Sequence, residues 1–170
     1  ANLHIAGGLA NGISMLYNAY RGGTPLILTA GQSDTRMLVE EPLLSGDLVE
    51  MCRQYSKWSG EVRHATDVPV AIRRAFRTAL TPPKGPVFLS LPWNVLDEEA
   101  DLDLTPASPV YARIHPDAKA LERAAGLLAG AENLLMLVGD RVAQAGAVSE
   151  AVRVAEILGA RVAAAIYSEV

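Results

Sequence analysis

The chain has very little of what builds disulfide scaffolds, membrane spans or export signals. Cys52 is the only cysteine, which excludes an internal disulfide and argues against a cysteine-based metal site. We expect it to be a small core or surface thiol. No apolar run approaches the ~20 residues needed to cross a bilayer, and the first residues lack the charged-then-apolar pattern of a signal peptide. We therefore expect no membrane partner and a cytoplasmic location.

Positive charge is also scarce. Lys and Arg together number 15 against 19 Asp and Glu, giving a net charge of -4 and a pI near 5.4. Nucleic-acid binders concentrate basic residues on one face. The arginines between residues 63 and 77 do cluster, but acids flank them and a helix would spread them. We expect a solvated helix face there and no nucleic-acid partner.

Helix and strand patterns alternate along the sequence. Half of the 170 residues are hydrophobic, which is typical of a globular chain able to bury a core as one domain or parts of two. Alternation of this kind predicts an α/β fold with parallel sheets flanked by helices. In the first half we expect a helix at 6–20, a strand at 26–30, a short helix at 50–55, an extended run at 57–62, a helix at 68–79 capped by Thr66 and Asp67, and a buried strand at 86–92.

A composition change after residue 96 predicts a linker. Acids and prolines displace the periodic apolar pattern over residues 97–115, which indicates an extended connection. The α/β rhythm then restarts. We expect a helix capped by Asp117, a strand at 134–138, a helix at 148–158 ended by Gly159, and a strand at 161–167. The prediction is two incomplete three-layer units, 1–96 and 116–170, joined by this linker.

His4 is the histidine best placed for chemistry. It precedes a Gly-rich bend that enters the first helix, and Gln32 follows a short apolar strand. Ligands in open α/β sheets gather at the carboxyl ends of strands, and an imidazole can donate or accept a proton near neutral pH. The glycine pair 7–8 would let a ligand approach the backbone closely. A helix-capping or packing role for His4 remains the alternative.

Other candidate sites are weaker. Gly139 and Asp140 follow an apolar strand, but the run lacks the G-x-G-x-x-G of a dinucleotide site. His64 and His115 lie in polar contexts and are expected at the surface. The acidic residues of 97–103 show no metal-ligand spacing.

Four short motifs in order carry a resemblance to a known family. They are Gly-x-x-Asn at 8–11, the Thr-Pro to Gly-Gln run at 24–32, Lys-Trp at 57–58 and the Gly-Pro to Leu-Pro run at 85–92. Their order and spacing resemble those of thiamine-diphosphate-dependent 2-oxoacid enzymes over nearly the whole chain. Asn-Leu-His at the start and Glu-Pro-Leu-Leu at 41–44 resemble the benzoylformate decarboxylase group within that family.

The resemblance implies a reaction and a division of roles. The reaction would be the non-oxidative loss of CO2 from an aryl or branched 2-oxoacid to give an aldehyde, with thiamine diphosphate and Mg²⁺ as cofactors. The implied roles are proton transfer to the substrate by His4, apolar pocket walls from Leu43 and Leu44, and a cofactor side shaped by Gly8 and Asn11 with Gln32 nearby. The resemblance also makes the first unit part of a pyrimidine-binding domain, and the second the start of a Rossmann-like central domain.

Parts of the family's machinery are expected outside this chain. The glutamate that acts on the cofactor's aminopyrimidine lies upstream of His4, and the motif that binds Mg²⁺ and diphosphate belongs to another domain. Because family members bind the cofactor between two subunits, the resemblance implies a homo-oligomer. The chain alone is then expected to be inactive. A carboligase of the acetolactate synthase kind and a non-catalytic binding or assembly domain remain alternatives, and the missing glycine fingerprint disfavours an NAD-binding domain.

Overall fold

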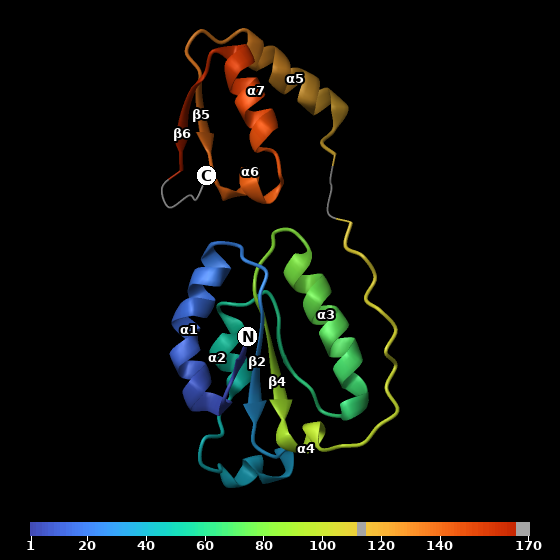
Figure 1. The fold of residues 1–170 in the computed structure, drawn as a ribbon. Helices are drawn as coiled ribbons and strands as arrows, with labels where there is room; N and C mark the ends of the chain where they lie inside the picture. The colour runs from blue at the N-terminus through green and yellow to red at the C-terminus, as the bar shows by residue number, and fades with distance from the viewer. Residues whose placement is uncertain (112–114, 166–170) are drawn as a thin grey trace. The chain divides into compact units, whose positions relative to one another are not determined.

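The computed structural model describes residues 1–111 and 115–165, and it divides the chain into two compact units, Ala1–Ala112 and Arg113–Val170. Each unit is a parallel sheet flanked by helices (Figure 1). The predicted α/β class is therefore confirmed. None of the helices within the described part of the chain combines the length and apolarity that crossing a bilayer requires.

The sheet of the first unit contains four parallel strands in the order β1-β2-β4-β3. The strands are β1 (Asn2–Leu3), β2 (Ile27–Gln32), β3 (Ser59–Glu61) and β4 (Val87–Pro92). In the register, Ala30 of β2 lies opposite Leu3 on one side and Ser90 on the other. All four strands therefore end near the same edge of the sheet.

Helices cover both faces of this sheet. Helices α1 (Ile5–Arg21) and α2 (Leu48–Arg53) pack on one face, and α3 (Val68–Leu80) packs on the other. Strand β4 lies between β2 and β3, and five of its six residues are buried. Its residues point alternately to the two faces: Phe88 joins the core under α1 and α2, whereas Val87 and Leu89 pack toward α3. A strand covered on both faces is a continuous apolar run, which is why the sequence predicts it well.

In the first unit, the two-residue strand β1 and three short helical elements were not predicted. The helical elements are the 3-10 helices η1 (Thr35–Glu40) and η2 (Ala65–Asp67) and the four-residue helix α4 (Trp93–Leu96), which follows β4 where the linker composition begins. The predicted capping of α3 by Thr66 and Asp67 is wrong. Asp67 makes no side-chain cap hydrogen bond, and Pro69 occupies the first turn, where its missing N–H costs nothing. At the start of η2, the Ala65 N–H donates to Glu98 Oε2 at 2.9 Å.

Residues 98–111 have no regular secondary structure, but their first part lies against α3. The Arg73 guanidinium donates to the carbonyl oxygens of Asp103 and Thr105 at 2.9 and 3.0 Å, and to the Asp103 carboxylate at 3.1 Å. Hydrogen bonds from the Thr105 hydroxyl and backbone N–H, together with Arg73, lower the pKa of Asp103. Contacts made by side chains thus hold the start of the predicted linker on the first unit.

The second unit has a two-stranded parallel sheet, β5 (Leu135–Val138) and β6 (Arg161–Ala164). Its helices are α5 (Ala118–Ala129), α6 (Asp140–Gln144) and α7 (Val148–Leu158). The Asp117 carboxylate caps α5 by accepting from the Ala120 N–H, and Gly159 ends α7 with a φ of 57°, both as predicted. Residues 166 and 167 of the predicted last strand lie outside the described residues. Among the described residues of this unit Ala155 alone is buried, so two strands enclose little core.

Candidate functional site

The carboxyl edge of the first sheet brings together the ends of four strands. His4 follows β1, Gln32 ends β2, Glu61 ends β3, and Trp93 follows β4. In parallel α/β sheets this edge is where ligands bind, because the loops and the helix amino ends converge there. The residues predicted from the sequence for the site all lie on this edge or on the elements that start from it.

His4 precedes the first turn of α1. It is the N-cap residue with extended backbone angles, and its imidazole makes no cap hydrogen bond. The side chain is exposed. The predicted cofactor-side residues Gly8 and Asn11 follow at helical spacing, so they share one side of α1 with His4. The next residue, Ile5, has a φ of 48°, a left-handed conformation that is costly for a β-branched side chain.

The same side of α1 is open to an approaching group. A Cβ built at Gly7 would meet no atom within 4 Å, and a Cβ at Gly8 would make only ordinary contacts with His4 and Leu3. The Asn11 Nδ2 donates to the Gly7 carbonyl at 3.1 Å, which fixes its amide against the helix. A flat group could therefore lie close to this backbone.

The loop between β2 and α2 forms the neighbouring part of the site. Asp34 caps η1 by accepting from the Arg36 N–H, and a side-chain hydrogen bond from Arg36 lowers the pKa of this carboxyl. The Thr35 N–H donates to Asn94 Oδ1 at 2.9 Å, which ties the start of the loop to α4. Further along, the Ala6 N–H of α1 donates to the Leu44 carbonyl at 3.3 Å. The loop thus runs directly past the first turn of α1.

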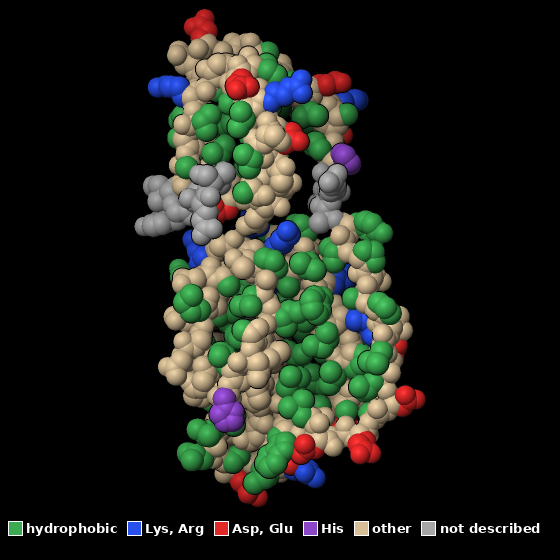
Figure 2. Space-filling view, viewed as in Figure 1, with side chains coloured by type: hydrophobic (Ala, Val, Ile, Leu, Met, Phe, Trp, Pro, Cys, Tyr) green, Lys and Arg blue, Asp and Glu red, His purple; other side chains and the backbone are tan. Residues whose placement is uncertain are grey.

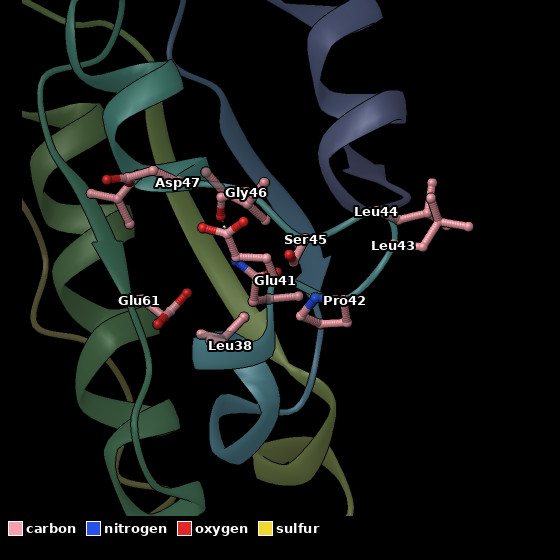
Figure 3. Close-up of a pocket in the computed structure, with 12 residues that line it drawn as sticks. Leu38, Glu41, Pro42, Leu43, Leu44, Ser45, Gly46, Asp47 and Glu61 are labelled. Carbon is pink, nitrogen blue, oxygen red and sulfur yellow. Dashed lines mark hydrogen bonds between the residues drawn. The ribbon is translucent and has the colours of Figure 1, made fainter.

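Leu43 and Leu44 occupy the tip of a tight turn. The Ser45 N–H donates to the Pro42 carbonyl at 2.9 Å, and Leu44 has a φ of 75°. A positive φ at the third residue is the signature of a type II turn, which favours glycine or asparagine there. Leu43 is 89% exposed and Leu44 is 49% exposed. Figure 3 shows both side chains pointing outward, away from Glu61 and Asp47. Strain of this kind is typical of functional loops.

A cavity of about 730 Å³ lies behind this turn. It is lined by Gln32, Glu61 and residues 38 and 41–49 (Figure 3). The Ser90 hydroxyl, which is fully buried, donates to Glu61 Oε2 at 2.9 Å and so fixes this carboxylate at the end of β3. The lining includes the carboxylates of Glu41, Asp47 and Glu61 but no Lys or Arg. The cavity therefore disfavours an anion such as a diphosphate.

The predicted site residues fall into two neighbouring groups. The cavity gathers Gln32, Leu43 and Leu44, whereas His4, Gly8 and Asn11 lie along α1. The hydrogen bond between Ala6 and Leu44 joins the two groups.

Sequence reasoning missed Glu61, Ser90 and Asn94. Glu61 and Ser90 lie in strands and Asn94 lies two residues after one, and that placement is the signal that could have identified them. Among the described residues no group of three His, Cys, Asp or Glu side chains could hold a metal ion.

Comparison with known proteins identifies the family. No protein-family model matches the chain. The chain is 35% identical over 160 residues to benzoylformate decarboxylase of Pseudomonas aeruginosa, covering 92% of this chain. A solved structure of a thiamin diphosphate-dependent enzyme from Mycobacterium smegmatis matches 99% of the chain with 40% identity and a TM-score of 0.86. Benzoylformate decarboxylase from Polynucleobacter necessarius matches 96% of it with 38% identity and a TM-score of 0.88. The chain belongs to the thiamine-diphosphate-dependent enzyme family.

The family resemblance drawn from the four motifs is therefore confirmed. Further relatives of this thiamine-diphosphate-dependent family member include acetolactate synthases and oxalyl-CoA decarboxylases, at 27% and 32% identity. The chain spans about 30% of the length of the P. aeruginosa relative and 31–32% of the two structures. The relatives therefore contain about two thirds of their length beyond the region matched here.

Proposed function

We propose that this chain is the part of a thiamine-diphosphate-dependent 2-oxoacid decarboxylase, of the benzoylformate decarboxylase type, that supplies one wall of the active site. The observation that carries the proposal is the exposed His4 at the end of β1 beside the outward-facing pair Leu43 and Leu44. The similarity to two benzoylformate decarboxylases supports the choice of reaction. The first unit would be part of the pyrimidine-binding domain, and the second the start of the central domain.

The residues present fit the ring part of the cofactor. The open side of Gly7 and Gly8 leaves room for a flat ring against α1, next to the amide of Asn11. The acidic lining of the neighbouring cavity does not fit the diphosphate. The diphosphate and Mg²⁺ would accordingly be held by a domain outside this chain, in a homo-oligomer whose subunits share the site.

The chain's own residues would supply proton transfer and a dry surface. Thiamine diphosphate, when bound, supplies the electron sink for the loss of CO2. His4 would hold or deliver a proton at the reacting carbon, for which an exposed imidazole without a cap hydrogen bond is suited. Leu43 and Leu44 would exclude water and contact the substrate's side group. The product would be the aldehyde that corresponds to an aryl or branched 2-oxoacid.

The proposal is tested on the complete protein with His4→Ala. A general acid or base contributes about 10²–10⁴-fold to a rate, so turnover of benzoylformate should fall by that order while the half-saturating concentration of thiamine diphosphate stays nearly constant. His115→Ala, another exposed histidine, is the matched control and should retain full turnover. Unchanged turnover in His4→Ala would refute the proton-transfer role.

Substrate preference and product identity test the remaining parts. Leu43→Ala and Leu44→Ala should shift the ratio of kcat/KM between bulky and small 2-oxoacids, because truncation of an apolar wall enlarges the space for the substrate's side group. An unaltered substrate profile would exclude the pocket role. If the main product were a carbon–carbon ligation product instead of the aldehyde, the acetolactate synthase kind of reaction, which the 27% identical relative supports, would replace this proposal.

A further inference from the structure

Gln32 occupies an internal position that its place at the end of a strand does not by itself predict. The residue is 4% exposed, and its side chain lies on the same face of β2 as Leu28 and Ala30, toward α1 and α2. A buried amide must find hydrogen-bond partners within the protein, because leaving them unmade is costly. The partners of Gln32 therefore indicate what it does.

Both ends of this amide bind the backbone of the loop that carries Leu43 and Leu44. The Oε1 accepts from the Ser33 N–H at 2.9 Å, where the chain leaves β2. The Nε2 donates to the Gly46 carbonyl at 2.8 Å, where the chain approaches α2, and the same carbonyl accepts from the Leu48 N–H. One side chain thus closes a loop whose two ends lie 14 residues apart.

The hydrogen bond to Gly46 acts two residues after the strained Leu44. Leu44 adopts a φ of 75°, which an L side chain keeps only where its surroundings enforce it. Three contacts hold this turn: the hydrogen bond from the Ser45 N–H to the Pro42 carbonyl, the one from the Ala6 N–H to the Leu44 carbonyl, and the one from Gln32 Nε2 to the Gly46 carbonyl. Of these three, Gln32 alone contributes a side chain, so substitution can remove its contact without altering the backbone.

We propose that Gln32 is a positioning residue that fixes the direction of the Leu43 and Leu44 side chains through Gly46, and so determines which 2-oxoacids fit the site. The substrate part of this inference rests on the proposed function. The structural part concerns this chain alone. Gln32 then selects between substrates without contacting them.

The test compares Gln32→Met with the unaltered complete protein. Methionine keeps the length of the side chain and removes both hydrogen bonds. Hydrogen exchange should become roughly tenfold faster at the Ala6 and Ser33 amides, which corresponds to a loss of about 1.4 kcal/mol of local stability. The ratio of kcat/KM for a bulky aryl 2-oxoacid over a small aliphatic one should change about tenfold, mainly through KM. The half-saturating concentration of thiamine diphosphate should stay within twofold.

Two further variants separate positioning from general stability. Gln32→Glu keeps the acceptor for Ser33 and loses the donor to Gly46, so fast exchange should appear at Ala6 but not at Ser33. This variant also carries the test if Gln32→Met does not fold. Ser56→Ala removes a partly buried hydroxyl that bonds to Cys52 and Ser59 away from the loop. It should alter neither the exchange at Ala6 nor the substrate ratio.

Two results would overturn the inference. One is unchanged exchange at Ala6 in Gln32→Met. The other is weakened binding of thiamine diphosphate with an unaltered loop, since Gln32 would then act as a cofactor ligand. Absence of any 2-oxoacid turnover in the unaltered protein would instead overturn the proposed function, and the exchange measurement would still decide the positioning role.

Discussion

The left-handed conformation of Leu44 leads to a prediction with an unusual sign. Glycine in an ordinary position is less stable than alanine by about 0.5–1 kcal/mol, because it loses more backbone freedom on folding. At a positive φ the order reverses, since a Cβ then costs roughly 1–2 kcal/mol. Leu44 has a φ of 75°. We therefore expect Leu44→Gly to be more stable than Leu44→Ala by about 1 kcal/mol, although both remove the same leucine contacts.

The matched control is the neighbouring residue of the same turn. Leu43 is not among the described residues with a positive φ and is even more exposed than Leu44. Leu43→Ala should therefore be more stable than Leu43→Gly. Urea unfolding of the four variants, compared by midpoint at constant slope, measures the two differences. If Leu44→Ala were at least as stable as Leu44→Gly, the strain and the turn geometry argued for this site would both be wrong.

Three other predictions concern the framework of the first unit. Burial raises the pKa of the Cys52 thiol from an ordinary value near 9 to about 12, so its thiolate fraction at pH 7–8 is roughly a thousandfold smaller than in the unfolded chain. A disulfide reagent should label it only after unfolding, and its contribution to stability, complete below pH 9, should be lost as the pH rises toward 12. Phe88→Ala should cost about 3–5 kcal/mol in urea unfolding because Phe88 is fully buried, whereas Phe76→Ala, at a half-exposed residue, should cost under about 1 kcal/mol. Arg73→Ala should accelerate limited proteolysis within residues 98–111 several-fold while changing global stability by less than about 1 kcal/mol. Arg74→Ala, at the next arginine of α3, should leave the rate of proteolysis unaltered. Equal cleavage in the two variants would contradict the contact of Arg73 with Asp103 and Thr105.

The elements that the sequence predicts well are those whose pattern follows from burial. The runs at 26–30 and 86–92 are strands because uninterrupted apolar residues suit a strand covered on both faces. The helix at 6–20 is confirmed to within one residue at each end, and Gly23 just beyond it has a positive φ of 64°, as suits a glycine after a helix end. These features depend on local residue types and on one repeating contact surface.

The elements that the sequence misses depend on partners far along the chain. The start of η1 is fixed by Asn94, which lies 59 residues away, and the N–H of Ala65 is satisfied by Glu98, 33 residues away. No local pattern encodes such pairings. The expected cap at Asp67 failed because η2 runs directly into α3, so Asp67 has helical backbone angles, φ -83° and ψ -18°, in place of the extended angles of an N-cap.

The site divides in the same way. Residue order alone is enough to put His4 before the first helix, to put Gln32 at the end of a strand and to indicate the family, because parallel strands that alternate with helices must present their carboxyl ends at one edge. Only the folded chain decides that Gln32 is buried against Gly46, that Leu43 and Leu44 point outward from a strained turn, and that Ser90 fixes the Glu61 carboxylate. Figure 2 likewise shows hydrophobic side chains gathered between α1 and α3 on the viewed face of the first unit. The hydrophobic periodicity of the sequence does not predict this surface. The physical reason is that side-chain direction and hydrogen-bond partnership depend on contacts between distant segments, which exist only after the sheet has formed.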